Sequence, residues 1–248
     1  MLSMTSRITV AGLALMVAGA AIQAAPRAGG GAAGEQSRPT YSVAPRPPKG
    51  ALMLSSGKDL RNWRQRDGQR AAWKVKDGVM TAAGGDIITD LKFTDAFIHV
   101  EFREPKEPDP ARGNSGVYVQ GRYEIQVIDS YGTKIPGKGD CGAIYDQHAP
   151  LVNACKPPLE WQSFDIIFRA PRMDDSGKVT GRARMTVLQN GMVIQNNVEV
   201  LGPTGSALDD RVGEPGPLLL QYHGSPVEYR NVWLVELPAK GSDTYQGR

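Results

Sequence analysis

The chain has 248 residues, of which 40% are hydrophobic and 22% charged, with 29 glycines, 18 prolines and 2 cysteines. This composition excludes collagen-like, coiled-coil and disulfide-dense proteins and indicates an ordinary chain rich in turn-forming residues. The 29 basic and 26 acidic residues are interspersed and give a formal net charge of +3, so we expect no nucleic-acid binding.

Residues 1–24 have the pattern of a bacterial signal peptide. One charged residue, Arg7, precedes an apolar run rich in Ala, Leu, Val and Gly that ends in small residues. A retained membrane anchor is the alternative, but the run is short for a span of about 20 residues. We therefore predict a periplasmic or secreted protein, with no membrane span in the mature chain.

Residues 25–49 are mainly Gly, Ala, Pro and Arg and hold almost nothing to bury, so they are predicted to be a flexible tether. One domain is expected over residues 50–240, followed by a short C-terminal tail at 241–248. A domain of about 190 residues suits a single core, because β-sandwiches often use about 200 residues in one domain.

The predicted domain reads as strands and turns. Apolar and polar side chains alternate over residues 97–104, and Asp77-Gly78 and Asn190-Gly191 each join two strand-like segments in a tight hairpin. Further strands are expected at residues 115–120, 123–129, 164–170, 218–222 and 227–237. About a dozen short strands with hardly any helical period predict an all-β, antiparallel jelly-roll sandwich.

Common enzyme motifs are missing from the sequence. Residues 137–142 match G-x-G-x-x-G, but no strand-to-helix unit surrounds them, so no dinucleotide site is expected. With 3 histidines in the chain, a zinc site made of several histidines is not expected either.

Cys141 and Cys155 are the only cysteines, and both follow the predicted export signal. Two such cysteines in an oxidising compartment favour a disulfide, which would close the loop between them. This disulfide would hold Tyr145 and His148, which lie in the loop. Two free thiols are the alternative.

Polar side chains alternate out of the predicted core along several strands. Around an expected turn at 121–122 they are Tyr118, Gln120, Glu124 and Gln126, and near the C-terminus they are Gln221, His223 and Arg230. Residues two apart lie on one side of a strand, so the first group shares a face of a sheet across the turn. Gln221 and His223 share a face in the same way, and Arg230 comes back on the following strand. Such a face can bind sugar hydroxyls and the apolar side of a sugar ring. A solvated outer face is the alternative.

Three blocks of the sequence resemble the 3-keto-disaccharide hydrolase domain family. They are NSGVYVQGRYEIQVIDSYG at 114–132, EWQSFDIIFRAP at 160–171 and LQYHGSPVEYRNVW at 220–233. The similarity extends over about residues 50–237 and implies a jelly roll like that of concanavalin A. The pair of cysteines departs from the family pattern.

The resemblance implies cleavage of glycosides whose sugar has been oxidised to a ketone at C3. The ketone acidifies the proton on C2, so a base can remove it and expel the C1 aglycone, and water adds afterwards. This reaction needs a base, a group that stabilises the enolate oxygen and a proton source for the leaving group.

Applied to the matched blocks, the resemblance implies Glu124 or His223 as the base or the acid. It implies Arg230, Gln126 and Gln221 as the groups that bind the keto or enolate oxygen. The sugar pocket would be lined by Asn114, Tyr118, Gln120, Tyr145 and His148, with Asp129 and Trp161 as weaker candidates. Two structural alternatives are a core histidine at 223 and an ion pair between Arg230 and Glu124.

Other cofactors and functions stay open at this point. A divalent metal held by Glu124 and His223, or a structural Ca²⁺, would agree with the resemblance, but no spacing identifies a metal site. A non-catalytic carbohydrate-binding module is the main alternative to the enzyme. An ordinary endo-glucanase is disfavoured, because no strand carries the pattern E-x-D-x-x-E. The sequence does not predict the aglycone, the anomer or the oligomeric state.

Overall fold

The computed structural model describes residues 46–106 and 111–241. The predicted signal peptide, most of the predicted tether and residues 242–248 lie outside these ranges. Within them, no helix is long and apolar enough to span a membrane.

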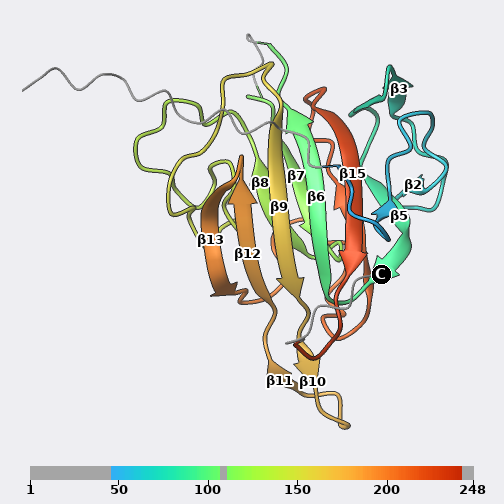
Figure 1. Ribbon diagram of the computed structural model, residues 1–248, viewed down its shortest axis with the longest axis vertical. Helices are drawn as coiled ribbons and strands as arrows, with labels where there is room; N and C mark the ends of the chain where they lie inside the picture. The colour runs from blue at the N-terminus through green and yellow to red at the C-terminus, as the bar shows by residue number, and fades with distance from the viewer. Residues whose placement is uncertain (1–45, 107–110, 242–248) are drawn as a thin grey trace, which may run out of the picture. The chain divides into compact units, whose positions relative to one another are not determined.

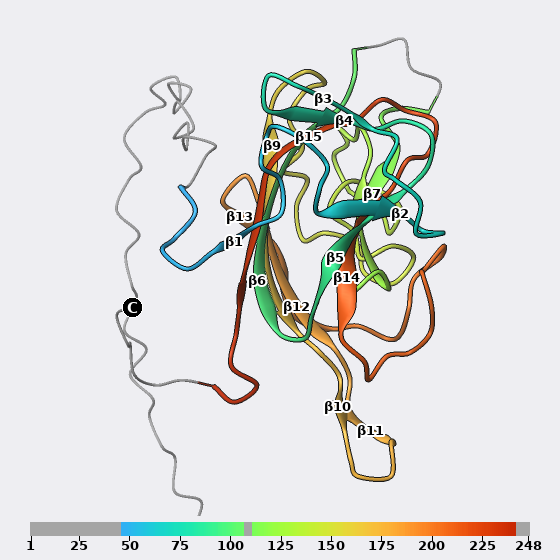
Figure 2. The same ribbon diagram turned by 90° about the vertical axis from the view of Figure 1, so that its right-hand side faces the viewer.

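The described residues form an antiparallel jelly-roll sandwich of two main sheets, and the predicted all-β fold is confirmed (Figures 1 and 2). The eight-stranded sheet has the order β13 (Met192–Glu199), β12 (Arg184–Gln189), β9 (Gln162–Arg169), β6 (Ala96–Arg103), β15 (Glu228–Glu236), β4 (Val79–Thr81) and β3 (Lys74–Lys76), with β1 (Leu52–Met53) also paired to β15. The five-stranded sheet has the order β2 (Trp63–Gln65), β5 (Ile87–Phe93), β14 (Gly216–Leu220), β7 (Ser115–Val119) and β8 (Tyr123–Val127). A two-stranded ribbon, β10 (Arg172–Met173) and β11 (Val179–Gly181), follows β9.

One face of each sheet fills the space between them. Val100 and Phe102 of β6 are fully buried, and Phe102 packs on Phe164 of β9 with ring centroids 4.7 Å apart. The smaller sheet contributes Val117, Val119, Ile125, Val127, Leu218 and Leu220 to the same core. Because successive side chains alternate along a strand, the residues between these point to the outer face of the smaller sheet.

The two predicted hairpins form as expected. Asp77 and Gly78 join β3 to β4 with φ values of 50° and 84°, and Asn190 and Gly191 join β12 to β13 with φ values of 53° and 80°. Two consecutive residues with positive φ match the twist of the flanking strands, which is why Asp-Gly and Asn-Gly occur here.

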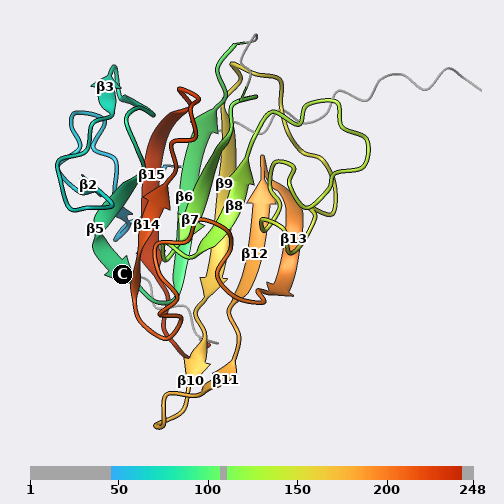
Figure 3. The ribbon, with the colours of Figure 1, turned by 180° about the vertical axis from the view of Figure 1, so that it is seen from behind.

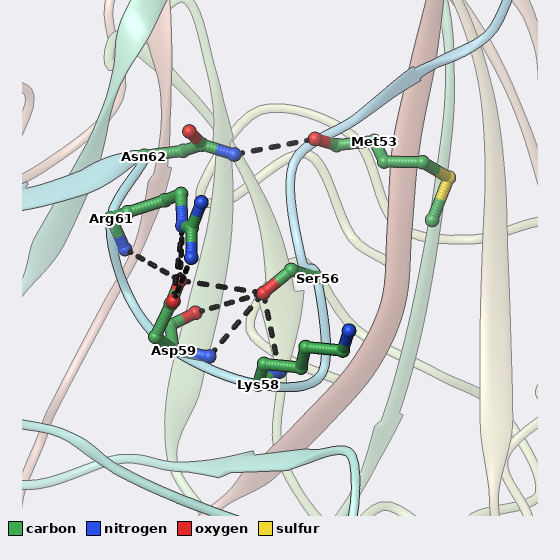
Figure 4. Close-up of polar contacts among 6 residues, drawn as sticks. All are labelled: Met53, Ser56, Lys58, Asp59, Arg61 and Asn62. Atoms are coloured by element: carbon green, nitrogen blue, oxygen red, sulfur yellow. Dashed lines mark hydrogen bonds and ion pairs between the residues drawn. The ribbon is translucent and has the colours of Figure 1, made fainter.

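Side-chain hydrogen bonds fix the loop between β1 and β2 (Figure 4). Ser56 Oγ accepts a hydrogen bond from Asp59 N at 3.3 Å, and Asp59 Oδ2 accepts one from Arg61 Nη2 at 2.6 Å. Asn62 Nδ2 donates to Met53 O at 3.4 Å. The loop is therefore ordered where it leads into β2, the edge strand of the smaller sheet.

Candidate functional site

A cavity of about 260 Å³ opens on the outer face of the smaller sheet. It is lined by Asn114, Tyr118, Glu124, Gln126, Tyr145, Gly205, Ser206, Gln221 and His223. All but Gly205 and Ser206 are among the residues that the sequence predicts for a sugar pocket, so the structure brings together seven of the ten predicted catalytic and substrate-binding residues.

The register of three neighbouring strands places these side chains together. In the pair of β7 and β8, Tyr118 lies opposite Glu124, and Gly116 lies opposite Gln126. On the other side of β7, Gln221 N donates a hydrogen bond to Gly116 O at 2.9 Å. The polar groups of β7, β8 and the end of β14 therefore face the same side of the sheet.

Gly116 provides space in the floor of the cavity. A Cβ atom at this position would lie 2.5 Å from Glu124 Oε1 and 2.8 Å from Tyr118 Cε2. These distances are shorter than any van der Waals contact, so only glycine allows both side chains their present positions. The sequence shows a glycine between two strand residues, but it does not show which side chains need the room.

Glu124 is a buried carboxyl group at the bottom of the cavity, with 4% of its surface exposed. Burial raises its pKa from the ordinary 4.5 to about 7, a hydrogen bond from Tyr118 partly opposes this shift, and the negative charge of Asp86 adds to it. The neighbouring Arg66 is paired with Asp86 at 2.7 Å. No ion pair of Glu124 occurs among the described residues, so the carboxyl group can bind or release a proton near neutral pH.

Tyr118 connects the carboxyl group to its surroundings. Its hydroxyl accepts a hydrogen bond from Gln221 Nε2 at 3.1 Å, and its single proton is shared between the Glu124 carboxyl group and Gly205 O, which is 3.0 Å away. Burial, together with the nearby Glu124, raises the pKa of Tyr118 above its ordinary value. The hydroxyl is therefore a neutral donor and acceptor at physiological pH.

Two further polar groups are oriented by neighbours. Gln126 Oε1 accepts a hydrogen bond from Val127 N at 3.1 Å, which leaves the NH₂ group of Gln126 for a ligand. Asn114 Nδ2 lies 3.4 Å from His223 Nδ1. When this amide donates to Nδ1, the proton of a neutral His223 is on Nε2.

The segment that connects β13 to β14 crosses the smaller sheet (Figure 3). Its residues Gly205 and Ser206 line one side of the cavity. Arg122, which is 1% exposed, anchors it through an ion pair from Nε to Asp209 Oδ1 at 2.6 Å and a hydrogen bond to Glu214 O at 2.7 Å. Thr204 Oγ1 accepts a hydrogen bond from Glu124 N at 2.9 Å. These contacts position Gly205 and Ser206, which no sequence pattern identifies as site residues.

Another wall of the cavity is formed by Tyr145, in the segment of residues 142–145 that runs beside β8. Gly142 N donates to Gln126 O at 2.9 Å, and Gln126 N donates to Ala143 O at 2.9 Å. Tyr145 N donates to Glu124 O at 3.1 Å. These backbone bonds bring Tyr145 to the rim of the cavity.

Two residues that were predicted to line the pocket lie elsewhere. Gln120 has a φ of 54° and belongs to the turn, because β7 and β8 pair as far as Val119 and Tyr123. Its side chain turns inward and donates to Phe93 O at 2.8 Å. His148 uses Nε2 in a 2.8 Å contact with Glu199 O, so it fastens its loop to β13 and does not line the cavity.

The prediction that Arg230 lies in this site is also wrong. Arg230 is on β15 of the larger sheet, where its Nε forms an ion pair with Glu101 Oε2 at 2.6 Å. Its guanidinium lies over the ring of Trp161, 3.9 Å from the centroid. The alternative ion pair with Glu124 is wrong for the same reason, because the two residues belong to different sheets.

The predicted disulfide is not formed. Cys141 and Cys155 are both free, buried thiols. Each sulfur atom has another polar contact. Cys141 Sγ accepts a hydrogen bond from Gln189 Nε2 at 3.3 Å, and Cys155 Sγ donates one to Lys156 O at 3.5 Å.

The cavity provides two side chains of the types that most often bind metal ions. Glu124 and His223 are its only two lining residues of the types His, Cys, Asp and Glu. Among the described residues, the one group of three or more such side chains with ligand atoms close together is Glu104, Cys141 and Cys155, outside the cavity. The predicted metal at Glu124 and His223 therefore has no third ligand of this kind.

A second cavity, of about 650 Å³, lies beside the β1–β2 loop. Its two tryptophans, Trp63 and Trp73, are 2% and 5% exposed, and their indole N–H groups donate to Leu54 O and Gly85 O. The rings are therefore part of the core and are not available to stack on a sugar. The cavity on the smaller sheet remains the candidate site.

Comparisons with known proteins agree with a carbohydrate-active domain. The model of the 3-keto-alpha-glucoside-1,2-lyase-like domain matches residues 50–235. A crystal structure from Parabacteroides distasonis ATCC 8503, named a "putative glycosyl hydrolase", is 40% identical with a TM-score of 0.69, over 76% of this chain and 84% of that one. A second structure with the same name and organism is 22% identical with a TM-score of 0.55, over 76% and 94% of the two chains, and supports the fold alone. No curated protein sequence matches this chain.

Proposed function

Because the chain belongs to the family of the 3-keto-alpha-glucoside-1,2-lyase-like domain, we propose that it is an exported enzyme that cleaves 3-keto-glycosides. The observation that carries the proposal is a buried carboxyl group, Glu124, whose pKa is about 7, in a cavity lined by amide, phenol and imidazole groups. A cavity of about 260 Å³ is smaller than sites for drug-sized ligands, which have about 300–1,000 Å³, and suits a single sugar ring.

The first step is removal of the C2 proton. Glu124 in its carboxylate form takes this proton, and the electron pair of the C–H bond moves into an enolate whose charge is on the C3 oxygen. A base whose pKa lies near the working pH combines a useful ionised fraction with sufficient proton affinity.

The enolate oxygen needs hydrogen-bond donors. The NH₂ group of Gln126 is available for this role because its Oε1 accepts from Val127 N. Gln221 Nε2 uses one N–H for the Tyr118 hydroxyl and has a second N–H in the same cavity. Donors that are already oriented, in a site with little water, stabilise a developing negative charge better than water does.

The second step is loss of the aglycone. The enolate electrons form the C1–C2 double bond, and the bond from C1 to the aglycone oxygen breaks. This oxygen takes a proton from His223 Nε2, and the proton that Glu124 removed from C2 returns to His223 through water, so both groups are restored. Addition of water across the double bond then places a hydroxyl group on C1 and a proton on C2. The net reaction is hydrolysis, and no paired carboxylates of the usual glycosidase kind are needed.

The test is incubation of the purified protein with a 3-keto-glucoside and with the matching unoxidised glucoside. We expect aglycone release from the keto substrate alone, a slower reaction when C2 carries deuterium, and a loss of about 10²-fold or more in Glu124→Gln. Glu160→Gln, a change at an exposed carboxylate, is the matched control and should keep the activity.

Binding of the sugar without release of aglycone from either substrate would overturn the enzyme proposal and favour a carbohydrate-binding module. Full activity in Glu124→Gln would overturn the assignment of the base.

A further inference from the structure

A second cluster of reactive side chains lies in the interior, outside the cavity. Glu104, which follows β6, and the thiols of Cys141 and Cys155 have ligand atoms that all lie within 4.8 Å of one another. All three residues are buried: Glu104 and Cys141 are each 1% exposed, and Cys155 is 9% exposed. The proposed reaction uses none of these groups.

The cluster contains buried oxygen atoms with no hydrogen-bond partner. Glu104 Oε2 accepts a hydrogen bond from Gln162 Nε2 at 2.8 Å, but Glu104 Oε1 has no partner. Gln189 donates through Nε2 to Cys141 Sγ at 3.3 Å, and its own Oε1 also has no partner. Buried polar atoms without a partner are rare and destabilising, so an unpaired Glu104 oxygen beside two thiols needs an explanation.

We propose that Glu104, Cys141 and Cys155 form a structural zinc site. Two thiolates and a carboxylate are typical zinc ligands, and a water molecule completes the usual four. Calcium and magnesium prefer sites made of oxygen atoms only, so the two sulfur ligands select a softer ion. On binding, the ion displaces the protons of the two thiols and of the carboxyl group, which pass to water.

Hydrogen bonds to the ligands already hold the cluster in place. Gln162 Nε2 donates a hydrogen bond to Glu104 Oε2, and the same nitrogen lies 3.6 Å from Cys155 Sγ. Gly113 makes room for the carboxylate, because a Cβ atom there would lie 2.6 Å from Glu104 Cγ. Outer contacts of this kind orient metal ligands in known sites.

The ion would join three separate parts of the chain. Glu104 follows β6 of the larger sheet, Cys141 immediately precedes the segment 142–145 that walls the candidate site, and Cys155 precedes β9. Zinc would thus fix the wall that carries Tyr145 without contacting substrate. This inference does not depend on the proposed reaction.

The test uses the full chain, purified under reducing conditions without chelator. We expect about one zinc ion per chain by elemental analysis, and a thiolate-to-metal charge-transfer absorption when Co²⁺ is added to the metal-free protein. Glu104→Gln should weaken zinc binding about 10-fold or more, and Cys155→Ala should abolish the charge-transfer band expected for two thiolates. Glu160→Gln, at an exposed position, should bind as the parent does.

Circular dichroism shows whether each variant is folded, and the Co²⁺ spectrum of the parent tests the site even if a variant fails to fold. Three results would overturn the proposal: no uptake of Zn²⁺ or Co²⁺ by the folded, reduced parent, uptake that Glu104→Gln and Cys155→Ala leave unchanged, or a Cys141–Cys155 disulfide in the exported protein isolated without reductant.

Discussion

Glu124 should make the protein less stable at alkaline pH. In the unfolded chain its carboxyl group ionises around its ordinary pKa of 4.5, whereas in the folded protein it keeps its proton up to about pH 7. Below pH 4.5 both states are protonated, so the group has no effect. Between these two values the unfolded state loses the proton first, and folding becomes progressively less favourable.

The size of this effect follows from the two pKa values. One pKa unit corresponds to about 1.4 kcal/mol, so the difference between 4.5 and about 7 amounts to about 3 kcal/mol above neutral pH. Glu124→Gln keeps the shape of the side chain but removes its ionisation. We therefore expect the variant to be about 3 kcal/mol more stable than the parent at pH 8.5, roughly 6–12 °C in Tm, and equally stable at pH 4.5.

The assay is urea unfolding at both pH values, followed by tryptophan fluorescence, with equal m-values as the check for a two-state comparison. Glu160→Gln should show little difference from the parent at either pH, because this carboxylate is exposed. A stability gap of the same size at both pH values would refute the reasoning, and so would a Glu124→Gln variant that is less stable than the parent at pH 8.5.

Three further predictions concern single substitutions. Gly116→Ala should abolish turnover with the fold intact by circular dichroism, because its Cβ would displace Glu124 Oε1, 2.5 Å away. Tyr118→Phe removes a hydrogen bond that lowers the pKa of Glu124, so the acidic limb of the pH–rate profile should move to higher pH. Asp95→Asn should destabilise the fold by about 3 kcal/mol at pH 7 in urea unfolding, because buried Asp95 is paired with Arg172. Burial raises the pKa of Asp95, but hydrogen bonds, above all from Arg172, bring it below its ordinary value. The difference in unfolding free energy between the parent and Asp95→Asn should therefore narrow as the pH falls below about 4.

The part of the site that depends on local alternation was predictable from the sequence. Tyr118 and Glu124 are on strands that are adjacent in the sequence and joined by a short turn, so period-two alternation puts them on one face. Gln120 fails by a single position, because the turn begins there and not at Gly121, and positive φ rotates its side chain inward. Alternation is reliable within paired strands, but it does not locate the end of the pairing.

The parts that depend on long-range pairing were not predictable. Arg230 follows Gln221 closely in sequence, yet β14 and β15 belong to different sheets, so their polar faces are separated. Strand β5 was not predicted, because exposed Asp90 and Lys92 interrupt its apolar pattern while it pairs with β14 and β2. Loop residues such as Ser206 have no periodicity at all, and the tertiary contacts of Arg122 position them.

The backbone of residues 142–145 has a role in solubility as well. β8 is the last strand of the smaller sheet, and such a strand normally offers unpaired N–H and C=O groups to which another chain can add. Gly142, Ala143 and Tyr145 pair with backbone groups of Gln126 and Glu124 along this edge and so block intermolecular strand addition there. Partial unfolding of this short segment would remove Tyr145 from the pocket and expose an aggregation-prone edge beside it, so we expect loss of activity and loss of solubility to occur together.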